Sequence, residues 1–301
     1  MISTKLFTAA LERLTRQIEA SGALDRWGQA ISEPVSTVIR PGWLKDLLSG
    51  TWMGHPAHPM LTDVTIGAWT SALMLDVLGD ESTRPGADRL IALGILTAVP
   101  TAAAGVSDLI DVTAREDRSV GVAHAIANLS ALTLYTAAYG LRRAGARRTG
   151  LGLSMAAAGV ATAGGFLGGH LSFRRGVGVD RTAFERRPTR WTAVLDEAEL
   201  GQDTPRRATV DGTELVLLRR GDRIFALANR CSHRGGPLVK GRVVDEEIEC
   251  PWHLSRFRLD DGSVVQGPAT APQPAYETRV VDGKVQVRAP SSSRSRARAR
   301  A

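Results

Sequence analysis

Long uncharged runs dominate the first half of the chain. Four stretches, at about residues 60–79, 90–108, 119–141 and 149–172, are nearly free of charge and long enough to cross the hydrocarbon core of a bilayer. In the first of them, Asp63 and Asp76 lie near the two ends. Because helices of this length rarely lack charge in soluble proteins, the pattern predicts four transmembrane helices joined by short loops.

Short alternating runs dominate the second half, at residues 191–289. Segments such as ELVLLRR, RIFALAN and KVQVR have the period of two that strands show, and Asp-Gly pairs at 211–212, 261–262 and 282–283 mark turns between them. We therefore expect a membrane α plus all-β protein. A four-helix transmembrane bundle at residues 41–173 precedes a linker at 174–190 and an antiparallel β-sandwich at 191–289.

The two ends of the chain are polar. Residues 1–40 begin with a segment that charge interrupts every few positions, and we expect an amphipathic helix lying on its own domain or on the membrane surface. Its apolar face would carry Leu6, Leu11, Leu14 and Ile18. Residues 290–301 form a basic tail of low complexity that we expect to be disordered. The net charge is +7, but the basic residues form no patch with interleaved aromatics, so nucleic acid is not an expected partner.

Four histidines fall at one end of the predicted helices. His55 and His58 precede the first span, His124 lies early in the third, and His170 ends the fourth. Neutral imidazoles from antiparallel helices can ligate a b-type haem or another metal. They can equally cap the first helix and form hydrogen bonds between helices. The sequence leaves both interpretations open.

The first of these helices also carries a family resemblance. The segment LLSGTWMGHPAHPMLTDVTIGAWTSALMLD, with the three spans that follow, resembles an uncharacterised family of bacterial four-helix membrane domains with an HPxHP signature. The resemblance covers about residues 40–173. It supports the number of helices and implies no activity.

The two cysteines of the chain each precede a histidine. The pattern is Cys231-x-His233, sixteen intervening residues, and then Cys250-x-x-His253. A zinc finger pairs its cysteines at other intervals, and two cysteines in a chain of this size do not make a disulfide scaffold. One thiolate and one imidazole in each loop suit an asymmetric two-iron cluster, with both cysteines on one iron and both histidines on the other. Zinc remains the alternative.

Residues 191–289 resemble a Rieske iron–sulfur domain along the whole stretch from WTAVLD to VQVR. The resemblance implies a [2Fe-2S] cluster on Cys231, His233, Cys250 and His253. Rieske proteins of the cytochrome b complexes carry a further cysteine in each loop, and the matching residues here are Gly236 and Trp252. The resemblance is therefore to the ferredoxin type.

The resemblance also bears on the reduction potential and the loop geometry. High-potential members place a serine and a tyrosine hydroxyl near the cluster sulfurs, where this chain has Ser255 and Phe257. We therefore expect a potential in the lower part of the Rieske range of roughly −150 to +300 mV. Leu254 stands where most relatives have glycine, so a positive φ at this position would strain the loop.

Together these features predict a multi-pass protein of the bacterial inner (plasma) membrane that carries single electrons. Its partners would be the lipid bilayer and a reductase or ferredoxin, and its acceptor is unknown, with a haem or metal on its own histidines as one option. No twin-arginine signal is visible, so we expect the cluster domain on the cytoplasmic side.

Other classes of function remain as alternatives. A redox sensor or a subunit of a membrane complex would need the same cluster. An oxygenase is disfavoured, because such enzymes append a large domain with a two-His-one-carboxylate site and only twelve residues follow the β-domain here. No catalytic triad, P-loop or dinucleotide fingerprint is present, so no catalytic residue or small-molecule substrate is identified.

Overall fold

The computed structural model describes residues 2–290, so the basic tail lies outside the described residues apart from Pro290. Its contacts divide the chain into two units. One unit contains the residues up to Arg40 together with Pro56–Val177, and the other contains Pro41–His55 together with the residues from Gly178 onward. The sequence had grouped residues 41–55 with the transmembrane domain, whereas their contacts place them in the β unit.

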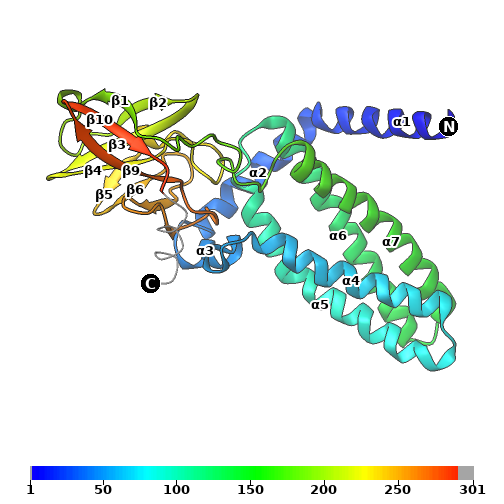
Figure 1. The fold of residues 1–301 in the computed structure, drawn as a ribbon. Helices are drawn as coiled ribbons and strands as arrows, with labels where there is room; N and C mark the ends of the chain where they lie inside the picture. Colours follow the sequence, from blue (N-terminus) through cyan, green and yellow to red (C-terminus); the bar gives the residue numbers. More distant parts are fainter. Residues whose placement is uncertain (1, 291–301) are drawn as a thin grey trace. The chain divides into compact units, whose positions relative to one another are not determined.

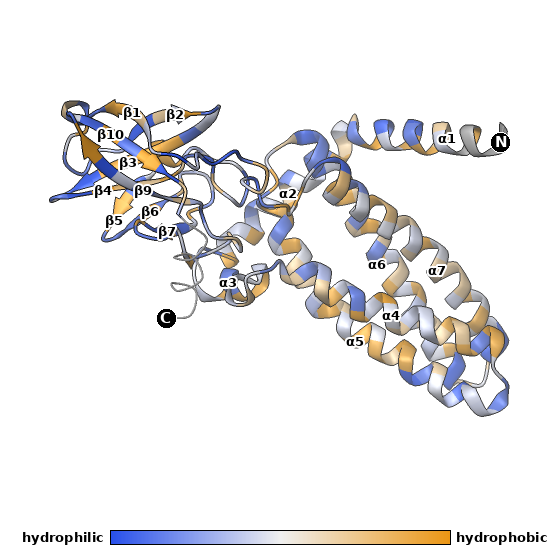
Figure 2. Cartoon of the chain, viewed as in Figure 1, coloured by the Kyte–Doolittle hydropathy of each residue, from blue (hydrophilic) through white to orange (hydrophobic). Residues whose placement is uncertain are grey.

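The helical unit confirms the number of predicted spans. Helices α1 (Ile2–Glu19) and α2 (Gly22–Val38) come first, and α4 (Ala57–Leu78), α5 (Arg84–Leu109), α6 (Arg115–Arg143) and α7 (Arg147–Gly169) follow (Figure 1). A π-helical turn at His170–Arg174 continues α7. Within residues 2–290, four helices are long and apolar enough to cross a membrane. Figure 2 shows apolar residues along α4–α7, as a bilayer-spanning helix requires.

Small residues allow these helices to approach closely. A Cβ at Gly164 would lie 2.9 Å from Asn128 Oδ1, and one at Gly168 would lie 3.0 Å from the His124 ring, so this GxxxG pair faces α6. The overlapping pair does not, because a Cβ at Gly165 would meet no atom within 4 Å and Gly169 faces only Phe173. Of the two overlapping GxxxG pairs in α7, Gly164/Gly168 and Gly165/Gly169, the first is therefore a helix contact.

A buried network of charges joins all four long helices. Arg142 of α6 contacts Asp76 of α4 at 2.6 Å and Asp88 of α5 at 3.2 Å, and its side chain is fully buried. Arg147 of α7 contacts the same two carboxylates at 2.8 and 3.1 Å. Ser154 of α7 accepts a further hydrogen bond from Arg142 at 2.9 Å. Each buried charge is thus compensated, which a low-dielectric environment demands.

The β unit contains two antiparallel sheets, as predicted (Figure 1). Its larger sheet has the order β1-β10-β9-β4-β3-β2, and its smaller sheet has the order β5-β6-β7-β8. The strands of the larger sheet are β1 (Thr192–Asp196), β2 (Arg206–Val210), β3 (Thr213–Arg220), β4 (Arg223–Ala228), β9 (Ala275–Val281) and β10 (Lys284–Arg288). Those of the smaller sheet are β5 (Arg242–Val244), β6 (Glu247–Glu249), β7 (Arg256–Arg258) and β8 (Val264–Gln266). Asp211-Gly212 and Asp282-Gly283 have positive φ at both residues, which is the turn geometry that tight hairpins favour.

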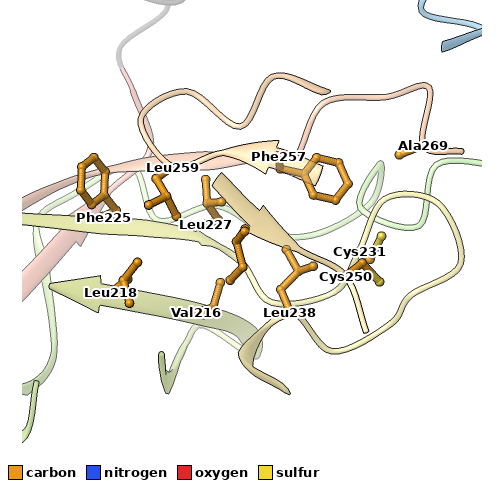
Figure 3. Close-up of a cluster of buried hydrophobic side chains, with 11 residues drawn as sticks. Val216, Leu218, Phe225, Leu227, Cys231, Leu238, Cys250, Phe257, Leu259 and Ala269 are labelled. Carbon is orange, nitrogen blue, oxygen red and sulfur yellow. The ribbon is translucent and has the colours of Figure 1, made fainter. Parts of the chain in front are cut away.

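An apolar core between the two sheets reaches the cysteine loops. Alternate residues of β3 and β4 meet side chains of the smaller sheet, and both cysteines belong to this cluster (Figure 3). Its buried members are Val216, Leu218, Phe225, Leu227, Cys231, Leu238, Ile248, Cys250, Phe257, Leu259 and Ala269. The other face of β3 and β4 forms a second core with β10. The cysteines are therefore positioned by the same packing that holds the sheets together.

The charge network gives a test of the helical unit. Replacing Arg142 by glutamine leaves two buried carboxylates with only Arg147, and we expect a loss of about 3 kcal/mol in the free energy of unfolding. Arg143→Gln is the matched control. Arg143 is exposed, so its replacement should change the free energy of unfolding by no more than about 0.5 kcal/mol. Thermal unfolding of the purified protein in detergent measures both. Equal stability of the two variants would contradict the structural role of the network.

Candidate metal centre

Two loops bring the four predicted ligands together in pairs. The loop between β4 and β5 carries Cys231 and His233, and the loop between β6 and β7 carries Cys250 and His253. The two thiols are buried, and a hydrogen bond joins them. The two imidazole rings lie 5.0 Å apart between centroids and are nearly perpendicular. Each pair thus takes one member from each loop.

The backbone around the sulfur atoms favours thiolates. The N–H groups of His233 and Arg234 donate hydrogen bonds to the Cys231 sulfur. Those of Trp252 and His253 donate to the Cys250 sulfur. The hydrogen bond from Cys231, together with these N–H groups, lowers the pKa of Cys250 to about 7. The same shared hydrogen bond, and then burial, raise the pKa of Cys231. A metal cation bound here would find one sulfur close to ionised at neutral pH and would favour ionisation of the other.

The histidine environment favours a neutral ring. Burial is the largest cause that holds the pKa of His233 well below its ordinary value, and the positive charges of Arg234 and Lys45 contribute to the same shift. A neutral imidazole keeps a lone pair for a metal. The donor set therefore consists of two sulfurs, the neutral ring of His233 and the ring of His253, which fits a two-iron cluster with unlike irons.

Two buried amides hold the first loop. Asn229 donates to Glu214 Oε2 at 2.8 Å and accepts from the N–H of Val239 at 2.8 Å. Gln273 accepts from the N–H of Ser232 at 3.0 Å and donates to the carbonyl oxygens of Ala228 and Arg230, each at 2.7 Å. Sequence reasoning missed both residues, because a single polar residue among loop residues gives no local signal that it is buried.

The second loop is held by charge and by a hydroxyl. Glu249 is 4% exposed and contacts Arg242 and Arg256, each at 2.8 Å. Ser255 is fully buried, and its Oγ accepts from the N–H of Ala269 at 3.0 Å. Its carbonyl oxygen accepts from the N–H of Cys250 at 2.8 Å. Rigid support of this kind keeps ligands in place before metal binds.

Gly236 and Trp252 meet where a disulfide would join the loops in the other Rieske class. A Cβ at Gly236 would lie 2.8 Å from Cys250 Sγ and 3.1 Å from the Trp252 ring. Any side chain at Gly236 would therefore push against the sulfur. Here the Trp252 ring packs against Gly236 where the two loops meet. Neither cysteine forms a disulfide, so both sulfurs are available to a metal.

Leu254 has a positive φ, the conformation that the sequence analysis expected to strain the loop. Its φ is +61°, in the left-handed region, and its N–H bonds the carbonyl oxygen of Cys250 at 3.1 Å. Residues other than glycine pay about 1–2 kcal/mol for this conformation. The loop therefore carries local strain directly beside the ligand His253.

The membrane histidines do not gather as one group. The rings of His58 and His124 lie 6.1 Å apart, and Nδ1 of each lies within hydrogen-bond distance of a backbone carbonyl oxygen, that of Thr101 at 2.9 Å and that of Gly164 at 2.8 Å. His170 instead contacts Glu19 at 2.9 Å, and His55 belongs to the β unit. Among the residues that the structure describes, no three His, Cys, Asp or Glu side chains form a site for a single metal ion.

Comparison with known proteins gives matches to both halves of the chain. Residues 190–277 match the model of the Rieske [2Fe-2S] domain, and residues 54–181 match that of a predicted membrane protein family, DUF2231. Neither description names a haem.

Individual relatives match the β unit. The anthranilate 1,2-dioxygenase ferredoxin subunit of Burkholderia cepacia is 34% identical over 89 residues, which are 30% of this chain and 82% of the relative. Ferredoxin CarAc of Metapseudomonas resinovorans is 31% identical over 98 residues, which are 32% of this chain and 92% of the relative. The solved ferredoxin of carbazole 1,9a-dioxygenase from Nocardioides aromaticivorans IC177 is 32% identical, with 34% of this chain and 100% of that chain covered and a TM-score of 0.32.

The strained loop residue gives a test of the site. Leu254→Gly removes the cost of the left-handed conformation, about 1–2 kcal/mol. The greater backbone freedom of glycine in the unfolded chain offsets about 0.5–1 kcal/mol of this. We therefore expect the free energy of unfolding to rise by roughly 0.5–1 kcal/mol. Denaturant unfolding of the full-length protein measures it. Asp245→Gly is the control, because aspartate at φ +51° tolerates this conformation better and the gain should be smaller. A loss of stability in Leu254→Gly would show that the leucine side chain supports the loop.

Proposed function

The chain belongs to the Rieske [2Fe-2S] family in its ferredoxin-like form, with a predicted membrane domain, and from this premise we propose a membrane-anchored electron carrier that takes single electrons from a reductase or a ferredoxin. The observation that carries the proposal is the pairing of two thiols and two imidazoles from two loops that the core holds in place. When bound, the cluster supplies reversible one-electron transfer.

We assign Cys231 and Cys250 to one iron and His233 and His253 to the other. Soft thiolates suit the iron that stays ferric, and neutral imidazoles suit the iron that is reduced. Lys45 and Arg234 place positive charge near His233, which favours the state that holds the additional electron. The hydrogen bonds to both sulfurs act in the same direction, because they stabilise negative charge on the thiolates.

The acceptor lies either in a partner protein or in the membrane unit. Two of the relatives are named as ferredoxins, one of them a dioxygenase subunit, so an oxygenase partner is one candidate. The pair His58 and His124 is the other, because the carbonyl contact at Nδ1 of each ring suits a proton there and leaves Nε2 as the atom for a metal or haem. At His124, the Asn128 amide nitrogen lies 3.2 Å from Nε2 and would have to move for a metal to bind.

We place the β unit on the cytoplasmic side of the inner membrane. Arg174, Arg175 and Arg181 closely follow the last span, and the positive-inside rule counts such residues. The opposite end of the bundle carries six arginines, at positions 84, 89, 142, 143, 147 and 148. Arg142 and Arg147 are held there in ion pairs with Asp76 and Asp88, and Arg84 is held in one with Glu81. A reporter fused after residue 289 tests the orientation.

The reduction potential tests the assignment of the cluster type. Ser255 has a buried hydroxyl in the same loop as Cys250, but Phe257 cannot donate a hydrogen bond, so we expect a potential in the lower part of the range of roughly −150 to +300 mV. An EPR-monitored titration measures it. Ser255→Ala should lower the potential further because it removes the remaining hydroxyl, whereas the same change at half-buried Ser263, in the turn between β7 and β8, should leave it unchanged. A wild-type potential near the top of the range would contradict this account.

The optical spectrum identifies the acceptor. If His58 and His124 hold a haem, the purified protein shows a Soret band that disappears in His58→Ala and in His124→Ala. His170→Ala is the control, because His170 is paired with Glu19 and should leave the band intact. A spectrum with cluster absorption alone would assign the acceptor to a partner protein.

A further inference from the structure

The short helix α3 (Trp43–Ser49) has its polar and apolar faces reversed. Lys45 and Ser49 are 2% and 3% exposed, whereas Trp43 is 77% and Leu47 50% exposed. Trp52, in the turn that follows, is 66% exposed. A helix on the surface of a water-soluble domain buries its apolar residues and exposes its charged ones. The exposed side of α3 at Trp43 and Leu47 is therefore apolar, unlike that of an ordinary surface helix.

The polar face of α3 is attached to the support of the metal centre. Asp46 Oδ1 accepts a hydrogen bond from the N–H of Gly267 at 2.7 Å, and Thr51 Oγ1 donates to the carbonyl oxygen of Ala269 at 3.2 Å. A Cβ at Gly267 would lie 2.2 Å from Thr51 Oγ1, so the two segments are in close contact. The N–H of Ala269 in turn bonds the hydroxyl of Ser255 in the second ligand loop. Residues 43–52 thus form part of the β unit and contact residues 267–269, which in turn bond the Ser255 hydroxyl.

The apolar face of α3 matches the bilayer surface. Trp52 lies five residues before Ala57, where the first candidate span begins, so the chain keeps the indole within about 17 Å of that point. Tryptophan is enriched at the boundary between lipid and water, because its ring is apolar and its N–H needs a polar partner. Seven helical residues cannot cross a bilayer but can lie in its interface.

We propose that residues 43–52 form an interfacial clamp. Trp43, Leu47 and Trp52 enter the headgroup region of the bilayer, while Asp46 and Thr51 hold the 267–269 loop, which bonds Ser255 of the second loop. The clamp fixes the cluster end of the β unit at the lipid surface, which makes a membrane-held acceptor more accessible than a soluble one. Only this last consequence rests on the proposed electron-carrier function.

Fluorescence quenching tests the lipid contact. The full-length protein is reconstituted into vesicles of phosphatidylcholine with brominated acyl chains, and Trp43→Tyr/Trp52→Tyr is compared with wild type. We expect the double variant to lose emission that bromine quenches, because the removed indoles lie in lipid. Trp191→Tyr is the matched control, since Trp191 lies in the β unit against Arg279 and Arg288 and its emission should resist brominated lipid. If the double variant instead loses emission that aqueous acrylamide quenches, α3 faces water and the proposal fails.

Hydrogen exchange tests the attachment to the loop. Asp46→Ala removes the acceptor of the Gly267 N–H, so we expect faster exchange in the peptide that covers residues 262–273 of the reconstituted protein. Asp245→Ala, in the turn between β5 and β6, is the control and should leave that peptide unchanged. Unchanged exchange in Asp46→Ala would overturn the clamp. Neither readout uses the cluster, so loss of the cluster signal with intact quenching would reject only the proposed function.

Discussion

Two thiolates and two imidazoles from separate loops have to meet at one buried place, and the β unit is built around this constraint. Cys231 and Cys250 are members of the apolar core between the sheets, so the fold and the ligand pair are stabilised by the same packing. Buried amides hold one loop and a buried glutamate holds the other. Polar groups enclosed in this way need complete hydrogen bonding, which gives the loops a single conformation before any metal is bound.

The residues of the candidate centre were predictable because their signal is local. Two cysteines, each with a histidine two or three positions later, need no knowledge of the fold, and alternating strands with Asp-Gly turns predict the sheets. Gln273 and Asp46 were not predictable, because their partners lie far along the chain. The hydrogen bond between Asp46 and Gly267, for example, joins residues 221 positions apart. The sequence accordingly assigned residues 41–55 to the wrong neighbours.

The membrane unit shows a different limit of sequence reasoning. An even number of spans predicts which helix ends share a face, and on this basis the sequence predicted four histidines at one end of the helices. Height alone does not determine the rotation of each helix about its axis, and rotation decides which rings meet. His58 and His124 meet, while His170 turns toward Glu19. The rotation of α7 likewise decides which of its two overlapping GxxxG pairs contacts α6, and only Gly164 and Gly168 do so. At the opposite end, Arg142 links two acidic residues that the sequence showed only as separate charges.

Pulsed EPR of the reduced full-length protein, with its histidines labelled with ¹⁵N, tests most directly whether two imidazoles ligate the reduced iron. Magnetic coupling to a nitrogen reports a ring bound to the cluster. We expect coupling to two histidine nitrogens, one of which disappears in His233→Cys and the other in His253→Cys, while His170→Ala retains both. A protein that binds iron and inorganic sulfide but shows no histidine coupling would contradict the assignment of the ligands and, with it, the account of this chain as a Rieske electron carrier.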